Sequence, residues 1–235
     1  MKKSKTIIIF LLGIVFLWAL FLGYKKMKQQ SIIEQTLESS HWKQRSEIIS
    51  TANKEKYKVI FLGNSLTEMF DVNYYFQDSS LLNAGITGDF TEGLVKRCDA
   101  IIQLKPEKLF IEIGINDIIE KVSLKEICTN YETLIKKIRQ ESPNTKIYIQ
   151  SNLPVIIRHP SLLTSNADVN NLVIEQNKNL QQISKKYNCI YVDIYNELMQ
   201  EKNKESLFIP DGIHLTPYAY SIWTSVVKPY LDKSS

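Results

Sequence analysis

The chain has 235 residues, which is enough for one full α/β domain and too short for two large domains. Its composition, 44% hydrophobic and 23% charged, is that of a globular protein and excludes an intrinsically disordered chain. The net charge is +4, but lysines and glutamates are scattered along the chain instead of forming basic stripes, so we expect no nucleic-acid partner.

Residues 1–28 predict a membrane anchor. A basic head precedes an uncharged, mostly apolar run of eighteen residues from Thr6 to Gly23. As a helix this run would be about 27 Å long, close to the hydrocarbon thickness of a bilayer. No small-x-small cleavage site follows it, which favours an uncleaved signal anchor. We therefore expect a single-pass protein of the cell membrane with its C-terminal domain outside the cytoplasm; the alternative is secretion after cleavage.

Residues 29–55 predict a helical linker between this anchor and a main domain at residues 56–235. The segment is polar, with apolar residues at the spacing of one or two amphipathic helices. Its His41, beside Trp42, is more typical of a surface or packing residue than of a catalytic one.

The main domain alternates short apolar runs with longer amphipathic segments. The runs predict five strands, at residues 57–62, 81–84, 108–113, 146–150 and 189–194. The longer segments predict helices at residues 91–104, 124–140, 169–187 and from 217 to about 231. This alternation indicates βαβ units, so we predict a parallel sheet with helices on both faces. The three cysteines have the spacing of neither a disulfide framework nor a zinc site.

Ser65 is the first candidate catalytic residue. It follows the apolar run Val59–Leu62 and Gly63, at the start of a short predicted helix, and Glu68 lies three residues later. This spacing fits a capping box, in which Ser65 only caps the helix. The other interpretation is a nucleophile at the carboxyl end of a strand, where α/β proteins keep their sites.

Four further residues lie where the fold would bring them to Ser65. Gly88 and Asn116 follow the second and third strands, and Asp211 and His214 precede the last helix. A nucleophilic serine needs a base, a group that orients the base, and donors for the oxyanion. His214 and Asp211 supply the first two, and the Ser65 and Gly88 backbone N–H groups with the Asn116 amide supply the donors. Singly, each residue has a plainer interpretation as a turn residue or a helix cap, but together and in this order they favour the catalytic one.

Four short motifs carry a resemblance to a known family. They are Gly63-Asn64-Ser65-Leu66, Asn83 to Asp89, Gly114-Ile115-Asn116-Asp117 and Asp211-Gly212-Ile213-His214. In this order they resemble the blocks of the SGNH hydrolases, also called the GDSL esterases and lipases, with Asn64 where the eponymous motif has Asp. The resemblance implies a flavodoxin-like α/β/α sandwich, serine hydrolysis without a metal or organic cofactor, and an oxyanion role for Gly88 rather than Gly85.

The resemblance leaves the substrate open. The family acts on acetylated carbohydrates, lysophospholipids, acyl-thioesters and other esters. The chain shows no long apolar lid, which favours short acyl groups, so we expect a carbohydrate O-acetylesterase. The alternatives are a lysophospholipase or thioesterase and a catalytically silent, membrane-tethered binding domain. Arg158 and His159, in the loop after the fourth strand, are more typical of solvated loop residues than of a substrate site.

Overall fold

The structure is a computed structural model that describes residues 2–156 and 166–232, with side chains described from residue 11 and, after the gap, from residue 167. Arg158 and His159 lie outside the described residues.

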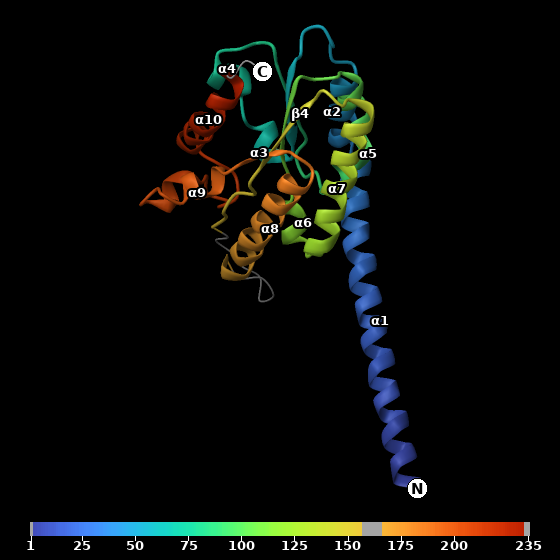
Figure 1. The fold of residues 1–235 in the computed structure, drawn as a ribbon. Coiled ribbons are helices and arrows are strands. Elements are labelled where there is room, and N and C mark those ends of the chain that lie inside the picture. The colour runs from blue at the N-terminus through green and yellow to red at the C-terminus, as the bar shows by residue number, and fades with distance from the viewer. Residues whose placement is uncertain (1, 157–165, 233–235) are drawn as a thin grey trace.

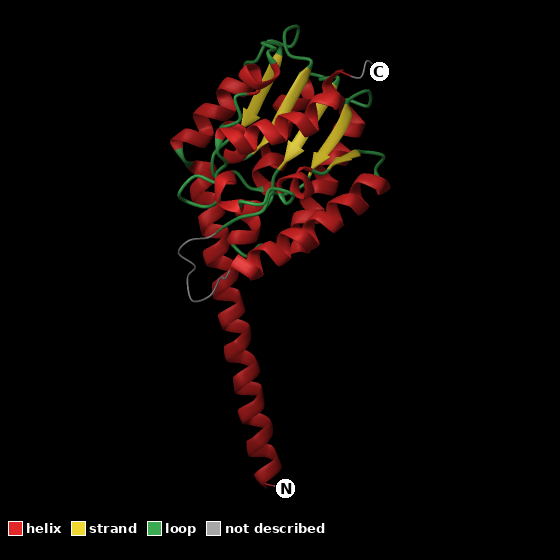
Figure 2. Cartoon of the chain, turned by 90° about the vertical axis from the view of Figure 1, so that its left-hand side faces the viewer, coloured by secondary structure: helices red, strands yellow, loops and turns green. Residues whose placement is uncertain are grey.

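The centre of the described chain is a sheet of five parallel strands, as predicted. The strands are β1 (Val59–Gly63), β2 (Leu81–Gly85), β3 (Lys108–Glu112), β4 (Lys146–Gln150) and β5 (Ile190–Val192). Their spatial order is β2-β1-β3-β4-β5, which is the flavodoxin-like order. Figure 2 shows the strands side by side between helices. The central strands are apolar on both faces because both faces are covered.

Helices cover both faces of this sheet. They are α3 (Ser65–Glu68), α4 (Val72–Phe76), α5 (Thr91–Gln103), α6 (Ile115–Ile119), α7 (Leu124–Glu141), α8 (Asn166–Lys186), α9 (Ile194–Leu198) and α10 (Pro217–Asp232), with a 3₁₀ turn at Lys204–Leu207. Helices α5, α7 and α8 pack in sequence on one face, whereas α10 packs with α4 on the other (Figure 1). This is the arrangement that right-handed crossovers produce for the observed strand order.

A ladder of aromatic rings fixes the register of the central strands. Phe61, Phe110 and Tyr148 are direct partners on β1, β3 and β4. Their rings stack at centroid distances of 4.9 Å and 4.4 Å. Such pairs on neighbouring strands are a main source of sheet stability. The register sets Gly63 beside both Gly85 and Glu112, so the carboxyl ends of β1, β2 and β3 lie level at the edge that carries the site.

Two further helices precede the sheet. Helix α1 (Lys2–Glu38) is continuous and extends well beyond the domain (Figures 1 and 2). Its far part exposes apolar side chains, but Ile33 and Leu37, near its end, are buried in the core. Helix α2 (Ser40–Ser50) begins after Ser39, whose side chain accepts a hydrogen bond from the Trp42 N–H, and it packs against α5.

The predicted membrane anchor is not supported. Its first ten residues lie outside the described side chains, and no helix of the described chain is long and apolar enough to cross a bilayer. From residue 11 onward, every eighteen-residue stretch of α1 includes Lys25, Lys26 and Lys28. The location outside the cytoplasm stays a prediction.

Candidate active site

Ser65 lies at the carboxyl end of β1 as the first residue of α3, and it is buried. The capping interpretation of Ser65 is wrong, because the N-cap is Asn64, whose side-chain oxygen accepts a hydrogen bond from the Leu66 N–H at 2.9 Å. The Ser65 hydroxyl is therefore not needed by the helix. It lies 2.9 Å from the Nε2 atom of His214, as the catalytic interpretation requires.

His214 is oriented by Asp211, three residues earlier in the chain. The ring Nδ1 atom lies 2.6 Å from Asp211 Oδ2, and Asp211 Oδ1 accepts hydrogen bonds from the Ile213 and His214 backbone N–H groups. Burial acts to raise the pKa of Asp211, but these hydrogen bonds outweigh it and the pKa lies below its ordinary value. Asp211 is thus a carboxylate at neutral pH, and the structure joins Ser65, His214 and Asp211 in one hydrogen-bonded series.

The loop that carries this pair is held to the loop after β4. The Ile156 N–H donates to the Gly212 carbonyl oxygen at 2.7 Å. Gly212 has a φ of +74°, and a Cβ at this position would lie 1.7 Å from the Ile156 oxygen. The close approach and the positive φ together require glycine here.

Gly88 lies in a tight turn after β2. The Asp89 N–H donates to the Ile86 carbonyl oxygen at 3.1 Å, and Gly88 has a φ of +79°. Thr87, the second residue of the turn, does not have a positive φ, whereas Gly88, the third, does. This combination is that of a type II turn. We call Ile86–Asp89 the oxyanion turn.

Asn116 lies beside this turn. Its side-chain nitrogen donates to the Asp89 carbonyl oxygen at 2.9 Å, which leaves its second N–H for another acceptor. The N-cap of α6 is Gly114, so the cap interpretation of Asn116 is wrong. The structure therefore brings Asn116 to the residue that follows Gly88. The assignment of both as oxyanion donors is a proposal.

A buried ion pair that the sequence motifs did not indicate holds Asp89, the last residue of the oxyanion turn. Arg97 Nε lies 2.8 Å from Asp89 Oδ2, and another Arg97 nitrogen donates to the Gly63 carbonyl oxygen at 3.0 Å. Burial raises the pKa of Asp89, and Arg97 and a hydrogen bond from Trp42 oppose the rise. The sequence does hold a signal for this pair, since Arg97 is a charged residue on the apolar stripe of α5.

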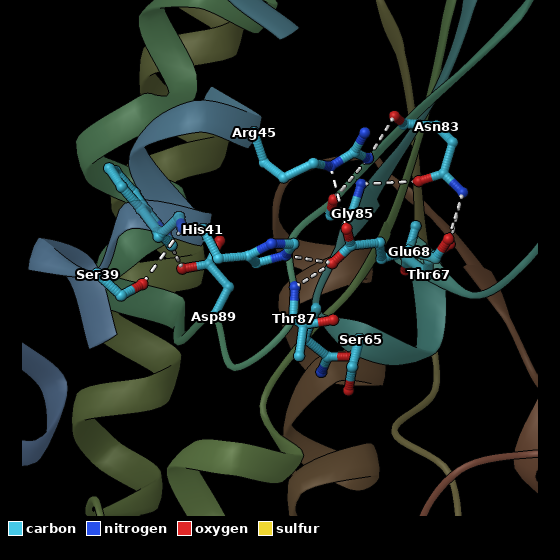
Figure 3. Close-up of polar contacts among 12 residues, drawn as sticks. Ser39, His41, Arg45, Ser65, Thr67, Glu68, Asn83, Gly85, Thr87 and Asp89 are labelled. Carbon is cyan, nitrogen blue, oxygen red and sulfur yellow. Dashed lines mark hydrogen bonds and ion pairs between the residues drawn. The ribbon is translucent and has the colours of Figure 1, made fainter. Parts of the chain in front are cut away.

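A second polar cluster connects α2 to α3 and the oxyanion turn (Figure 3). Glu68 lies 3.1 Å from Arg45 Nε through Oε1 and 3.1 Å from His41 Nε2 through Oε2. The same Oε2 atom accepts a hydrogen bond from the Thr87 N–H at 2.5 Å. Burial acts to raise the pKa of Glu68, but hydrogen bonds from Thr87 and His41 outweigh it and lower the pKa. No sequence motif pointed to this cluster, because its members come from segments that only the fold brings together.

Asn83 contributes to the site from β2. Its side-chain nitrogen donates to the Thr67 and Phe70 carbonyl oxygens at 2.7 Å and 2.8 Å, and its oxygen accepts from the Gly85 N–H at 2.9 Å. Asn83 thereby ties the end of α3, and with it Ser65, to the strand that leads into the oxyanion turn.

Other acidic groups near the site are deeply buried. Burial raises the pKa of Glu112 to about 8, although Asn152 donates to it at 3.3 Å. Burial also raises the pKa of Asp117 to about 7, against hydrogen bonds from Thr91. Among the described side chains, no group of three or more His, Cys, Asp or Glu residues could hold a metal ion.

The sequence and the fold both resemble known ester hydrolases. Residues 61–222 match the GDSL-like Lipase/Acylhydrolase family. The platelet-activating factor acetylhydrolase IB subunit beta homolog of Drosophila melanogaster is 29% identical over 141 residues, which are 57% of this chain and 62% of that protein. The chain thus spans less than two thirds of the length of this relative.

Two of the solved structures that share the fold show how far the likeness extends. One is a Streptococcus pneumoniae protein with the provisional name of a platelet activating factor, with a TM-score of 0.69, 23% identity, and coverage of 92% of this chain and 99% of that one. The other is a catalytic mutant of an acetylxylan esterase from Geobacillus stearothermophilus, with a TM-score of 0.62, 17% identity, and coverage of 76% and 95%.

The family match covers more than half of the chain and includes all four sequence motifs, from Ser65 to His214. It agrees with the parallel sheet and with the hydrogen-bonded series at its carboxyl edge. The chain belongs to the GDSL-like lipase/acylhydrolase (SGNH) family of carboxylic ester hydrolases.

Proposed function

We propose that the chain is a serine esterase that removes acetyl groups from O-acetylated carbohydrates. The observation that carries the proposal is the series of hydrogen bonds from Ser65 Oγ to His214 and from His214 to Asp211. In this arrangement the serine has a base, and the base has a carboxylate that fixes its tautomer.

The reaction then runs in two halves. His214 Nε2 takes the proton of Ser65 as Oγ attacks the ester carbonyl carbon, and Asp211 stabilises the imidazolium. The oxyanion accepts hydrogen bonds from the Ser65 and Gly88 N–H groups and the Asn116 amide. Collapse breaks the ester bond, and the leaving alcohol takes the proton from His214. A water molecule, deprotonated by His214, attacks the acyl-serine and releases acetate.

Two of the similar proteins support acetyl as the acyl group. The names of the Geobacillus stearothermophilus esterase and the Drosophila melanogaster relative both specify the hydrolysis of acetyl groups, from xylan in one case and from a platelet-activating factor in the other. They differ in the alcohol that is released. The Drosophila relative is the observation that favours a second candidate, an acetylated lipid.

The experiment is a chain-length series with the full chain. We expect p-nitrophenyl acetate to be hydrolysed faster than the butyrate, and the octanoate slowest. Acetate release from acetylated xylan should exceed release from platelet-activating factor. Ser65→Ala should lower turnover by about 10³-fold or more. Preference for the lipid would select the second candidate, and preference for octanoate would favour a lipase or thioesterase. Folded protein without Ser65-dependent turnover would favour a silent binding domain and overturn the proposal.

A further inference from the structure

We propose that Glu68 is a positioning residue for the oxyanion turn, and that α2 holds Glu68 in place. The inference rests on the proposed role of the Gly88 N–H as an oxyanion donor. Helix α2 lies before residue 61, where the family match begins, so this contribution comes from outside the matched region.

Glu68 connects the nucleophile to the turn. Helix α3 is a single turn that begins at Ser65 and ends at Glu68. The Glu68 carboxylate accepts the N–H of Thr87, the residue directly before Gly88, at 2.5 Å. One short helix therefore carries the attacking oxygen at its start and, at its end, the group that fixes the turn.

The turn needs such a group because it has two accessible forms. In a type II turn the central peptide, here Thr87–Gly88, faces in roughly the opposite direction from a type I turn. Glycine at the third position adopts the φ of either form without steric cost. The observed φ of +79° at Gly88 belongs to type II. The hydrogen bond from Glu68 restrains the peptide that precedes the central one, and this favours the observed form and the direction of the Gly88 N–H.

Two side chains of α2 contact the Glu68 carboxylate, one at each of its oxygens. Arg45 pairs with Oε1 at 3.1 Å and also donates to the Gly85 carbonyl oxygen at 3.0 Å, so it links Glu68 to the end of β2. His41 contacts Oε2 at 3.1 Å, beside the Thr87 N–H. Figure 3 shows the Arg45 and His41 side chains reaching from α2 toward Glu68, with Thr87 and Ser65 below them in this view. Both carboxylate oxygens are thus occupied, and the side chain is held in one orientation.

The test uses Glu68→Gln in the full chain. Glutamine has the same shape but no charge and one acceptor oxygen. It therefore loses the ion pair with Arg45 and, if its oxygen faces Arg45, also the hydrogen bond from the Thr87 N–H. We expect kcat for p-nitrophenyl acetate to fall about 10-fold or more, with KM within about 2-fold, because the lost contact acts on the oxyanion and not on the bound ester. Arg45→Ala should lower kcat in the same way but less. Glu132→Gln is the control, since Glu132, on the surface of α7, also forms an ion pair with a basic side chain, that of Lys186 on α8 at 2.8 Å.

A second measurement reports on the turn itself. The backbone amide NMR signal of Gly88 should move in Glu68→Gln and Arg45→Ala and stay in place in Glu132→Gln. A folded Glu68→Gln protein with kcat within about 2-fold of the wild type would overturn the proposal. If Glu68→Gln does not fold, Arg45→Ala decides by the same criterion. Ser65→Ala, measured in parallel, distinguishes failure of this inference from failure of the proposed function. If Ser65→Ala is inactive and Glu68→Gln is fully active, only the role of Glu68 is removed. If Ser65→Ala is active, the proposed function is removed.

Discussion

At the scale of single residues, the site depends on Asn64 and Ser65 having different roles, helix capping for Asn64 and the contact with His214 for Ser65. Both residue types are good helix caps, but only one position can cap α3. Asn64 does so through its side-chain oxygen, which leaves the Ser65 hydroxyl to His214. An aspartate, the usual residue of the motif, also has an oxygen at this place. The departure at Asn64 therefore keeps the function of the position.

Asn116→Ala tests the oxyanion assignment. The amide is fixed by its bond to the Asp89 carbonyl oxygen and has one N–H left to give. If that N–H stabilises the oxyanion, its loss should lower kcat about 10²- to 10³-fold while the protein stays folded. Asn179→Ala on α8, whose amide nitrogen donates to the Gln176 side-chain oxygen at 3.5 Å, is the control. A loss below about 3-fold would remove Asn116 from this role.

Glu112→Gln tests the buried carboxyl. Its pKa is raised from 4.5 to about 8, so the folded protein keeps a proton that the unfolded chain releases above about pH 4.5. The wild type should therefore lose stability as the pH rises from 5 to 8, by up to about 1.4 kcal/mol per pH unit. Glutamine is always neutral, so the variant should gain stability relative to the wild type over this range.

Denaturant midpoints at pH 5, 6.5 and 8 measure this effect. The same substitution at the exposed Glu55 is the control. If the denaturant midpoints of Glu112→Gln and the wild type differed by the same amount at every pH, the Glu112 carboxyl would not retain its proton in the folded protein.

At the scale of elements, the loop between Asp211 and His214 is expected to be intolerant of any side chain at Gly212. Gly212→Ala places a Cβ against the Ile156 oxygen in a backbone with φ of +74°. Positive φ alone costs an alanine about 1 kcal/mol or more. We expect Tm to fall by at least about 2–4 °C and kcat by about 10-fold or more, because the loop that carries His214 must shift away from Ile156. Gly23→Ala in the exposed part of α1, where the new Cβ meets no atom within 4 Å apart from the neighbouring helix backbone, should leave both values unchanged.

The elements differ in how well the sequence predicts them. The strand at residues 146–150 is predicted with its observed bounds, and the helix at 124–140 with an error of one residue, because a buried run and an amphipathic stripe are local signals. The placement of Ser65, Gly88 and Asn116 at one edge was predictable for another reason: these residues follow parallel strands, and parallel strands end at a common edge. The N-cap of α3 was not predictable, since the neighbouring Asn64 and Ser65 are both good capping residues. The contact between Arg45 and Glu68 was not predictable either, since it depends on where α2 packs.

At the scale of the whole molecule, the hydrophobic core extends beyond the predicted domain boundary at residue 56. Ile33 and Leu37 on α1 and Ile49 on α2 are buried in the same cluster as the strands. Leu37 packs toward α5, where a Cβ on Gly93 would lie 2.8 Å from its side chain. The segment predicted as a linker is thus packed as part of the domain.

Leu37→Ala measures this packing. The side chain is only 5% exposed, so its truncation should cost about 2–5 kcal/mol of the free energy of unfolding. Leu20→Ala, on the same helix but 55% exposed, should change stability by less than about 0.5 kcal/mol. Denaturant unfolding of both variants checks the prediction. Equal stability of the two would mean that the end of α1 does not belong to the core.

The contacts between α2 and Glu68 have a consequence for chimaeric proteins made by joining segments of different family members. A chimaera that joined residues 61–222 to the leading segment of another family member would inherit every motif residue and still lose Arg45 and His41. Crossovers in a shuffled library should therefore fall before Ile33, where α1 leaves the core, and not at the start of the matched region. If α2 positions Glu68 as proposed, the segment that must be transferred to keep activity begins upstream of the first signature motif.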